Sequence, residues 1–245
     1  MTTPQKILFG FHAITVRLKT AQNSVREIYI DTSRKDQRMQ RFIERVNTAG
    51  IRMIEADKTR LENLAKSPRH QGVVAIAEDL VLARNLDDLL DTLNEPPLLL
   101  VLDSVTDPHN LGAALRVADG AGAHAVIAPK DHAVGINATV SKVASGAAET
   151  VPYFMVTNLA RALRELKERN IWCIGTSNAA QQSIYDVNLN LPLAMVLGAE
   201  GSGMRRLTKE HCDQLVSIPM KGAVESLNVS VASGICLYEA LRQRR

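Results

Sequence analysis

The apolar residues in the first part of the chain follow two alternating kinds of spacing. In some segments they recur every three or four positions, as on one side of a helix, and in others they form short β-branched runs typical of strands. Because these segments are short and closely spaced, residues 1–79 are predicted to form a small α/β domain. The predicted helices are 10–21, 38–50 and 57–66, and the predicted strands are 25–30, 51–56 and 70–78.

Residues 80–96 are predicted to link this domain to a second one, residues 97–245. The middle of the link is compatible with a short helix, which the Pro96–Pro97 pair would end. After it, continuous apolar runs alternate with longer amphipathic segments, which predicts a mostly parallel sheet covered by helices on both faces. The predicted strands are 98–105, 125–130, 151–156, 171–177, 193–200 and 215–220, and the predicted helices are 110–122, 137–148, 158–170, a short one near 207–214 and a closing one from 227.

Composition narrows the class of protein without identifying it. Hydrophobic residues make up 46% of the 245 positions and aromatic residues only 4%, so the core is mainly aliphatic, as in helices packed on a parallel sheet. The net charge of +3 permits a nucleic-acid partner, and it fits a slightly basic enzyme of another kind equally well.

Signals for metal binding, export and membrane insertion are weak. The cysteines, Cys173, Cys212 and Cys236, lack zinc-ligand or CxxC spacing, and the six histidines include no HExxH pair. We therefore expect buried, reduced thiols and no metal.

The first residues lack the apolar core of a signal peptide, and the aliphatic run 98–102 is too short for a membrane span. The expectation is a soluble, cytoplasmic protein with no membrane partner.

Ligands of parallel α/β sheets bind beyond the carboxyl ends of the strands, so the residues after each strand are the candidates for chemistry. In "DSVTDPHNLGAALR" (103–116), Asn110, Gly112 and Arg116 are expected near the start of a helix, where an arginine beside free N–H groups can grip a phosphate. The alternative, equally open, is that Asn110 caps the helix, Gly112 permits close packing and Arg116 is solvated.

Two further segments combine small residues with polar ones. In "VLGAEGSGM" (196–204), three glycines surround Glu200 in a spacing that fits neither GxGxxG nor a Walker loop, so the choice lies between a ligand-binding loop and a plain turn. In "SLNVSVASG" (226–234), Ser226 is a possible helix cap, and Asn228 either caps as well or faces a ligand. Ser230, Ser233 and Gly234 form a small-residue face suited to close packing.

Together, "NLGAALR", "VLGAEGSGM" and "IPMKGAVESLNVSVASGICLYEA" resemble the three motifs of the SpoU family of RNA ribose 2′-O-methyltransferases. These motifs are Asn-x-Gly-x-x-x-Arg, Gly-x-Glu-x-x-Gly and a closing segment from Pro to Ser-Leu-Asn-Val-Ser. The part that ends in "HQGVVAIA" is similar to the family's L30e-like substrate-binding domain. Among family members, the chain is most similar to those that methylate a guanosine ribose in the peptidyl-transferase P-site loop of 23S rRNA.

The resemblance implies a SPOUT-type catalytic domain with a C-terminal trefoil knot, a homodimer through that domain, and S-adenosylmethionine as the methyl donor. Arg116 is implied to bind the phosphate beside the target ribose and to orient its hydroxyl. The implied catalytic residues are Arg116, Glu200, Asn110, Ser226 and Asn228, and the implied cofactor-binding residues are Thr176, Gly198, Ile218, Met220, Ser226 and Leu227.

The first domain offers a basic cluster that would contact the phosphates of 23S rRNA, with a solvated helix face as the alternative. Its residues are Arg34, Lys35, Arg38 and Arg41. Three other functions compete with the one implied. They are the same methylation on another RNA such as a transfer RNA, RNA binding without catalysis, and a Rossmann-type oxidoreductase, which the missing GxGxxG disfavours.

Overall fold

The computed structural model describes residues 5–78 and 85–245. The chain divides into two compact units, residues 1–81 and 82–245, and each is described here by itself. The predicted domain boundary after residue 79 falls on 79–84, outside the described residues. Within the described ranges, no helix is long and apolar enough to cross a membrane.

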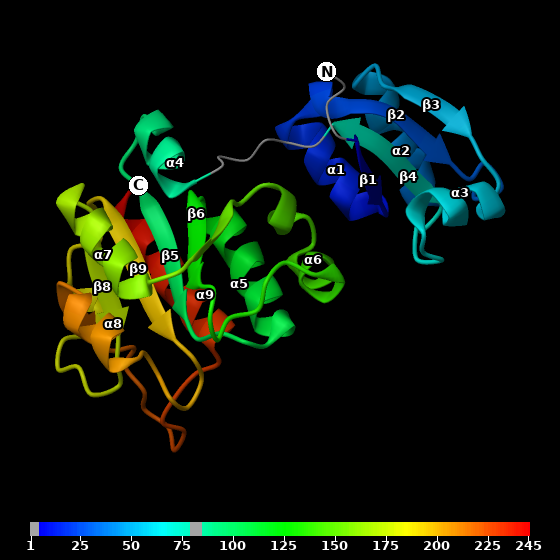
Figure 1. Ribbon diagram of the computed structural model, residues 1–245. Helices are drawn as coiled ribbons and strands as arrows, with labels where there is room; N and C mark the ends of the chain where they lie inside the picture. The colour runs from blue at the N-terminus through cyan, green and yellow to red at the C-terminus, as the bar shows by residue number, and fades with distance from the viewer. Residues whose placement is uncertain (1–4, 79–84) are drawn as a thin grey trace. The chain divides into compact units, whose positions relative to one another are not determined.

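The N-terminal unit is a four-stranded mixed sheet in the order β1-β4-β2-β3 (Figure 1). Strand β4 is antiparallel to β1 and β2, whereas β2 and β3 are parallel. Helices α1 and α2 pack on one face of the sheet, and α3 packs on the other. The strands are β1 (Gln5–Phe9), β2 (Val25–Ile30), β3 (Arg52–Glu55) and β4 (Val73–Glu78), and the helices are α1 (Phe11–Thr20), α2 (Gln37–Thr48) and α3 (Lys58–Ala65).

Strand β1 was absent from the sequence-based prediction. It lies at the edge of the sheet and buries only Leu8, so its apolar residues do not form the clear alternation that marks a half-buried strand. The other elements of this unit match the prediction within a few residues. As predicted, Asp57 caps α3, since its side chain accepts a hydrogen bond from the backbone N–H of Arg60.

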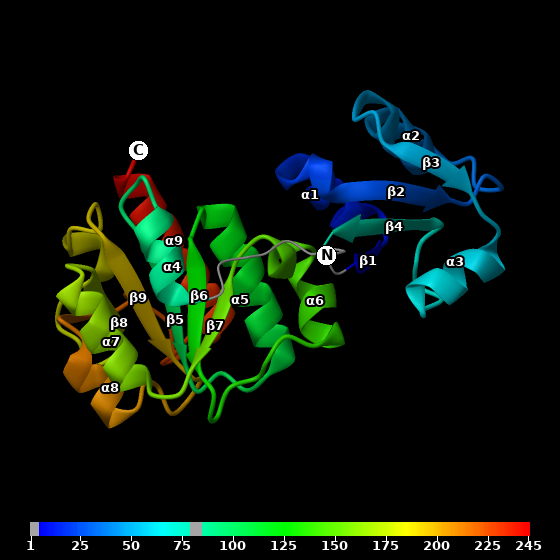
Figure 2. The same cartoon turned by 45° about the horizontal axis from the view of Figure 1, so that its top comes forward.

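The C-terminal unit contains a six-stranded parallel sheet in the order β10-β8-β9-β5-β6-β7. Central strand β5 is buried along its whole length, which confirms the prediction from its continuous apolar run. Helices α5, α6 and α9 cover one face, and α4 and α7 cover the other (Figure 2). The strands are β5 (Leu98–Asp103), β6 (Ala125–Pro129), β7 (Tyr153–Val156), β8 (Trp172–Thr176), β9 (Leu193–Gly198) and β10 (Gln214–Val216), and the helices are α4 (Leu86–Thr92), α5 (Pro108–Ala121), α6 (Ala138–Ala144), α7 (Leu159–Glu168), α8 (Arg206–His211) and α9 (Val229–Gln243).

Helix α4 lies in the segment predicted to be a linker. Asn85 caps it by accepting a hydrogen bond from the backbone N–H of Asp88, and Leu86, Leu89 and Leu90 pack against the core of the C-terminal unit. The described part of this segment therefore contributes to the second core. The trefoil knot stays a prediction.

The starts of helices α5 and α9 and the end of strand β10 differ from the predictions. Helix α5 begins at Pro108 because the side chain of Asp107 caps it, so Asn110 is inside the first turn and is not the cap. Helix α9 begins at Val229 with Asn228 as its cap, which excludes Ser226 from that role. Strand β10 ends at Val216, so Ile218 and Met220 lie in the following loop.

Candidate active site

The loops that follow β8 and β9, together with the segment before α9, surround a pocket of about 410 Å³. Because β5, β8 and β9 are parallel, their carboxyl ends meet at this edge, where Asp103 of β5 pairs in register with Gly198 of β9. The amide of Asn178 donates to the backbone oxygen of Glu225 at 2.6 Å and so ties two of the loops together. The lining includes all six residues implied for cofactor binding: Thr176, Gly198, Ile218, Met220, Ser226 and Leu227.

The loop after β9 folds back tightly over the end of its own strand. The N–H of Gly203 donates to the carbonyl of Ala199 at 2.9 Å, and both Gly201 (φ 81°) and Gly203 (φ 66°) adopt left-handed conformations. A Cβ atom on Gly198 would lie 2.0 Å from the carbonyl carbon of Gly203, so only glycine fits there. The close return brings the backbone of the loop, together with Glu200, to the wall of the pocket.

Asn228 joins three segments that are far apart in the sequence. Its amide nitrogen donates to the side-chain oxygen of Asn110 at 2.8 Å and to the carboxylate of Glu200 at 3.3 Å. Its amide oxygen caps α9, accepting from the backbone N–H of Ser230 at 2.9 Å and from the Ser230 hydroxyl at 2.7 Å. The capping role that the sequence left open for Asn228 is therefore confirmed, and the same side chain also connects Asn110 with Glu200 at the rim of the pocket. That Asn228 faces a ligand stays a prediction.

Arg116 lies apart from this cluster. It is exposed in the third turn of α5, eight residues after Pro108, which corresponds to about 12 Å of helix rise. The prediction that it lies beside the free N–H groups of the helix start is therefore wrong. Within the described part of the chain, its side chain makes no hydrogen bond or ion pair, and it does not line the pocket.

Gly112 serves packing, since a Cβ there would lie 2.7 Å from Cβ of Val143 in α6.

An ion pair between the buried Asp103 and the exposed Arg205, which the sequence did not predict, supports the rim of the pocket. Asp103 is fully buried at the end of β5, and its carboxylate accepts from the backbone N–H of Arg205 at 2.8 Å and from Nε of Arg205 at 2.7 Å. A buried carboxylate requires such partners. The pair connects the loop that leads to Asn110 with the loop that carries Glu200. Its only signal in the sequence is an aspartate that ends an apolar run.

The thiols take no part in this site. Cys173 and Cys236 are buried and free, as predicted, whereas Cys212 is only partly buried. Burial raises the pKa of Cys173 and of Cys236 to about 12, so both stay protonated near neutral pH.

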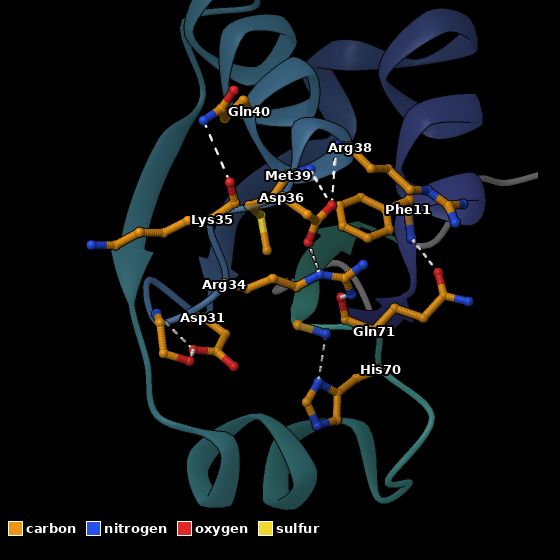
Figure 3. Close-up of polar contacts among 12 residues, drawn as sticks. Phe11, Asp31, Arg34, Lys35, Asp36, Arg38, Met39, Gln40, His70 and Gln71 are labelled. Carbon is orange, nitrogen blue, oxygen red and sulfur yellow. Dashed lines mark hydrogen bonds and ion pairs between the residues drawn. The ribbon is translucent and has the colours of Figure 1, made fainter.

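In the N-terminal unit, the four residues of the predicted RNA-binding cluster differ in their surroundings, and Figure 3 shows three of them, Arg34, Lys35 and Arg38. Arg34 donates to the carboxylate of Asp36 and, at 2.7 Å, to the backbone oxygen of Gln71. Arg38 stacks over the Phe11 ring, with Cζ 4.7 Å from the centroid. Lys35 is exposed and points away from that ring. Arg41 is also exposed and lies in a groove between α1 and α2.

Residues 97–238 match the SpoU rRNA Methylase family, and residues 7–81 match the family described as RNA 2′-O ribose methyltransferase substrate binding. The chain belongs to the SpoU rRNA methylase family. The residues that match the methylase family fall in the parallel-sheet unit, and those that match the substrate-binding family fall in the mixed-sheet unit.

Relatives and solved structures support the assignment along the whole chain. A 23S rRNA (guanosine-2′-O-)-methyltransferase RlmB from Ralstonia nicotianae is 66% identical, with 98% of this chain and 96% of the relative covered. The protein of the same name from Bordetella pertussis is 59% identical, with 98% of both chains covered. The SpoU methyltransferase AviRb from Streptomyces viridochromogenes, solved in complex with AdoMet, has a TM-score of 0.72 at 25% identity, covering 98% of this chain and 90% of its own.

Proposed function

We propose that this protein transfers a methyl group from S-adenosylmethionine to the ribose 2′-oxygen of a guanosine in 23S rRNA. The observation that carries the proposal is the convergence of Asn110, Glu200 and Asn228 at a pocket formed by loops after parallel strands. The relatives that span the whole chain are named for this reaction. The predicted target is the peptidyl-transferase P-site loop, and the predicted location is the cytoplasm, where ribosomal RNA is found.

The pocket suits a cofactor that has both polar and apolar parts. Its volume of about 410 Å³ falls within the range of ~300–1,000 Å³ of ordinary small-molecule sites. Apolar side chains from Leu197, Ile218 and Leu227 line it beside polar groups of Thr176 and Ser226. When bound, S-adenosylmethionine supplies an electrophilic methyl group. The six implied residues would hold it through side chains and through the backbone that Gly198 leaves accessible.

The cluster at the rim would position the RNA hydroxyl. The two N–H groups of the Asn228 amide are both engaged, so Asn228 holds Asn110 and Glu200 in place. Glu200 is a carboxylate acceptor at the pocket wall, and it is the group placed to accept a hydrogen bond from the hydroxyl. Alignment of reacting groups alone supplies roughly 7–11 kcal/mol of barrier reduction.

Arg116 is proposed to bind the phosphate beside the target ribose. Its guanidinium is exposed and has no partner within the described residues, which leaves all five N–H donors free for a bidentate phosphate contact. Because a guanidinium does not lose its proton in proteins, its role would be to orient and polarise the hydroxyl, without acting as the base.

The C-terminal unit is proposed to form a homodimer through the surface that includes α9. Val231 and Tyr238 on this helix are each 51% exposed, although its other face is packed in the core. An apolar face of this kind is typical of association between subunits. Sedimentation at micromolar concentration should give the mass of a dimer, and a monomer would contradict the proposal.

The decisive test of the function is mass spectrometry of 23S rRNA from a deletion strain, after incubation with the protein and isotope-labelled S-adenosylmethionine. A labelled 2′-O-methylguanosine in the P-site loop is expected. Label in transfer RNA alone would identify the alternative substrate. If no RNA is labelled although calorimetry detects cofactor binding, the protein is not an enzyme for these RNAs.

A further inference from the structure

Helices α1 and α2 of the N-terminal unit form a small groove with a strongly positive lining. Its volume is about 200 Å³, below the range of ~300–1,000 Å³ of most small-molecule pockets. No carboxylate lines it. The lining consists of Phe11, His12 and Thr15 from α1, and Arg38, Arg41, Phe42 and Arg45 from α2.

Three arginines of α2 share the side that faces this groove. Arg38, Arg41 and Arg45 follow each other at spacings of three and four residues, which places them on one side of a helix. All three are exposed, and among the described residues none is ion-paired with a carboxylate. Other exposed arginines of this unit do find a carboxylate, as in the contact of 3.2 Å between Arg26 and Glu78. Unpaired like charges held side by side favour an anionic partner.

One of these guanidinium groups lies against an aromatic ring that lines the groove. The Phe11 ring is nearly buried and meets Phe42 edge-on, with their centroids 5.3 Å apart. Cζ of Arg38 lies 4.7 Å from the centroid of Phe11, a cation–π distance. Arg38 is exposed as well as placed against the ring, so its guanidinium is available to a second group from outside the groove. RNA-binding proteins stack unpaired bases on guanidinium planes in this way.

Arg34 also lies over Phe11, at 5.0 Å, but it is held differently. Its donors contact the Asp36 carboxylate and the Gln71 carbonyl, and this contact lowers the pKa of Asp36 (Figure 3). Gln71 in turn accepts a hydrogen bond from the backbone N–H of Phe11 at 3.4 Å. Arg34 therefore braces the loop around Phe11, and it leaves fewer donors for a ligand than Arg38 does.

We propose that this groove binds one unpaired nucleotide of the RNA substrate. Its base would stack on the Arg38 guanidinium, and the phosphates on either side would contact Arg41, Arg45 and His12. The small volume fits one base of a strand that continues outside the groove. A duplex is disfavoured, because its bases are stacked inside the helix and cannot enter. The proposal rests on the proposed RNA substrate and adds to it a binding site with His12 and Arg45.

The test uses the full-length protein, a fragment of 23S rRNA that contains the target loop, and binding measured at several salt concentrations. The double variant Arg41→Gln/Arg45→Gln should bind more weakly, and the slope of log affinity against log salt should fall by about 1.4, or 0.7 for each lost phosphate contact. Arg38→Lys keeps the charge but loses the plane, so it should weaken binding at least about 5-fold with the slope unchanged.

The matched control is Arg52→Gln, which removes an exposed arginine of β3 outside the groove. It should leave affinity and slope unchanged, and circular dichroism checks that every variant is folded. If the double variant behaves like the control, or if a duplex RNA of equal length competes as well as the loop, the groove does not bind an unpaired nucleotide. Methylation by the wild-type protein tests the proposed function separately, so the two failures are distinguishable.

Discussion

The pocket of the C-terminal unit and the groove of the N-terminal unit are built on different principles. At the pocket, polar side chains bind one another, as Asn228 binds Asn110 and Glu200 across separations of 118 and 28 residues. At the groove, α2 presents three arginines that have no carboxylate partner among the described residues. Side chains that hydrogen-bond one another are held in fixed positions, and catalysis requires such fixed positions to align the reacting groups. Groups that are left unpaired are available to a flexible polyanion.

The largest effect is expected for Arg116→Ala, because Arg116 has no partner among the described residues, whereas Asn110, Glu200 and Asn228 bind one another. Losing one donor to a transition state typically costs about 10²–10³ in rate, so methylation should become undetectable or nearly so. Cofactor affinity, measured by calorimetry, should stay the same, since Arg116 does not line the pocket. Arg164→Ala, an exposed arginine of α7, is the control. Wild-type turnover in Arg116→Ala would show that the exposed cation of α5 is not used.

Gly198→Ala tests whether the pocket depends on a rigid loop. The added methyl group would lie 2.0 Å from the backbone of Gly203, so the loop must move away from β9. We expect affinity for S-adenosylmethionine to fall by about 100-fold or more, because a loop that is displaced loses its contacts. Gly222→Ala introduces the same methyl group into open space and should bind normally. Equal affinities in the two variants would mean that the tight return of the loop is not needed.

Asn228→Asp separates the two roles of this residue. The carboxylate can still accept from the N–H of Ser230 and cap α9, but it cannot donate to Asn110 and would repel Glu200. Turnover should fall by at least about 10-fold through misalignment of the rim, with the free energy of unfolding nearly unchanged. Asn228→Ala should lose the cap as well, and it should unfold about 1 kcal/mol more easily in urea. If both variants lose equal stability and activity, the cap contributes little, and the contacts that Asn228 donates to Asn110 and Glu200 are its main function.

Asp103→Asn probes the buried pair beneath the rim and has the smallest expected effect. The amide still accepts one hydrogen bond from Arg205, so the loss is that of a charge-assisted contact, about 1–2 kcal/mol of unfolding free energy. The measurement is urea denaturation. Asp107→Asn is the control, because both residue types cap helices well and α5 should persist. A stability loss no larger than that of the control would mean that the Asp103–Arg205 pair contributes little.

The limits of prediction from the sequence are visible in particular elements. The helix that starts after Asp57 and the buried strand Leu98–Asp103 were predicted, because a cap and a continuous apolar run are local signals. Strand β1 was missed because it buries only Leu8, and the start of α5 was misplaced because Asp107, three residues upstream of the predicted start, provides the cap. One buried residue is too weak a signal to predict a strand such as β1. The start of α5 depends on a capping side chain that lies outside the predicted helix.

The candidate site shows the same division between local and long-range information. The six residues implied by the motif resemblance do line one pocket, whereas Arg116 lies away from the helix start where it was expected. The resemblance relies on residue identities along the chain. Where a side chain points depends on the true start of its helix and on the elements packed around it.

The order of the helices and strands apart from edge strand β1, the parallel sheet and the residues available for chemistry were predicted from the sequence alone, because periodicity and capping act over a few residues. Tertiary structure decided which of these residues meet. The bonds of Asn228 to Asn110 and Glu200, the burial of Asp103 against Arg205, and the contrast between the braced Arg34 and the available Arg38 all arise from packing between distant or separate elements. Such contacts follow from the three-dimensional arrangement of the elements, which local spacing does not encode.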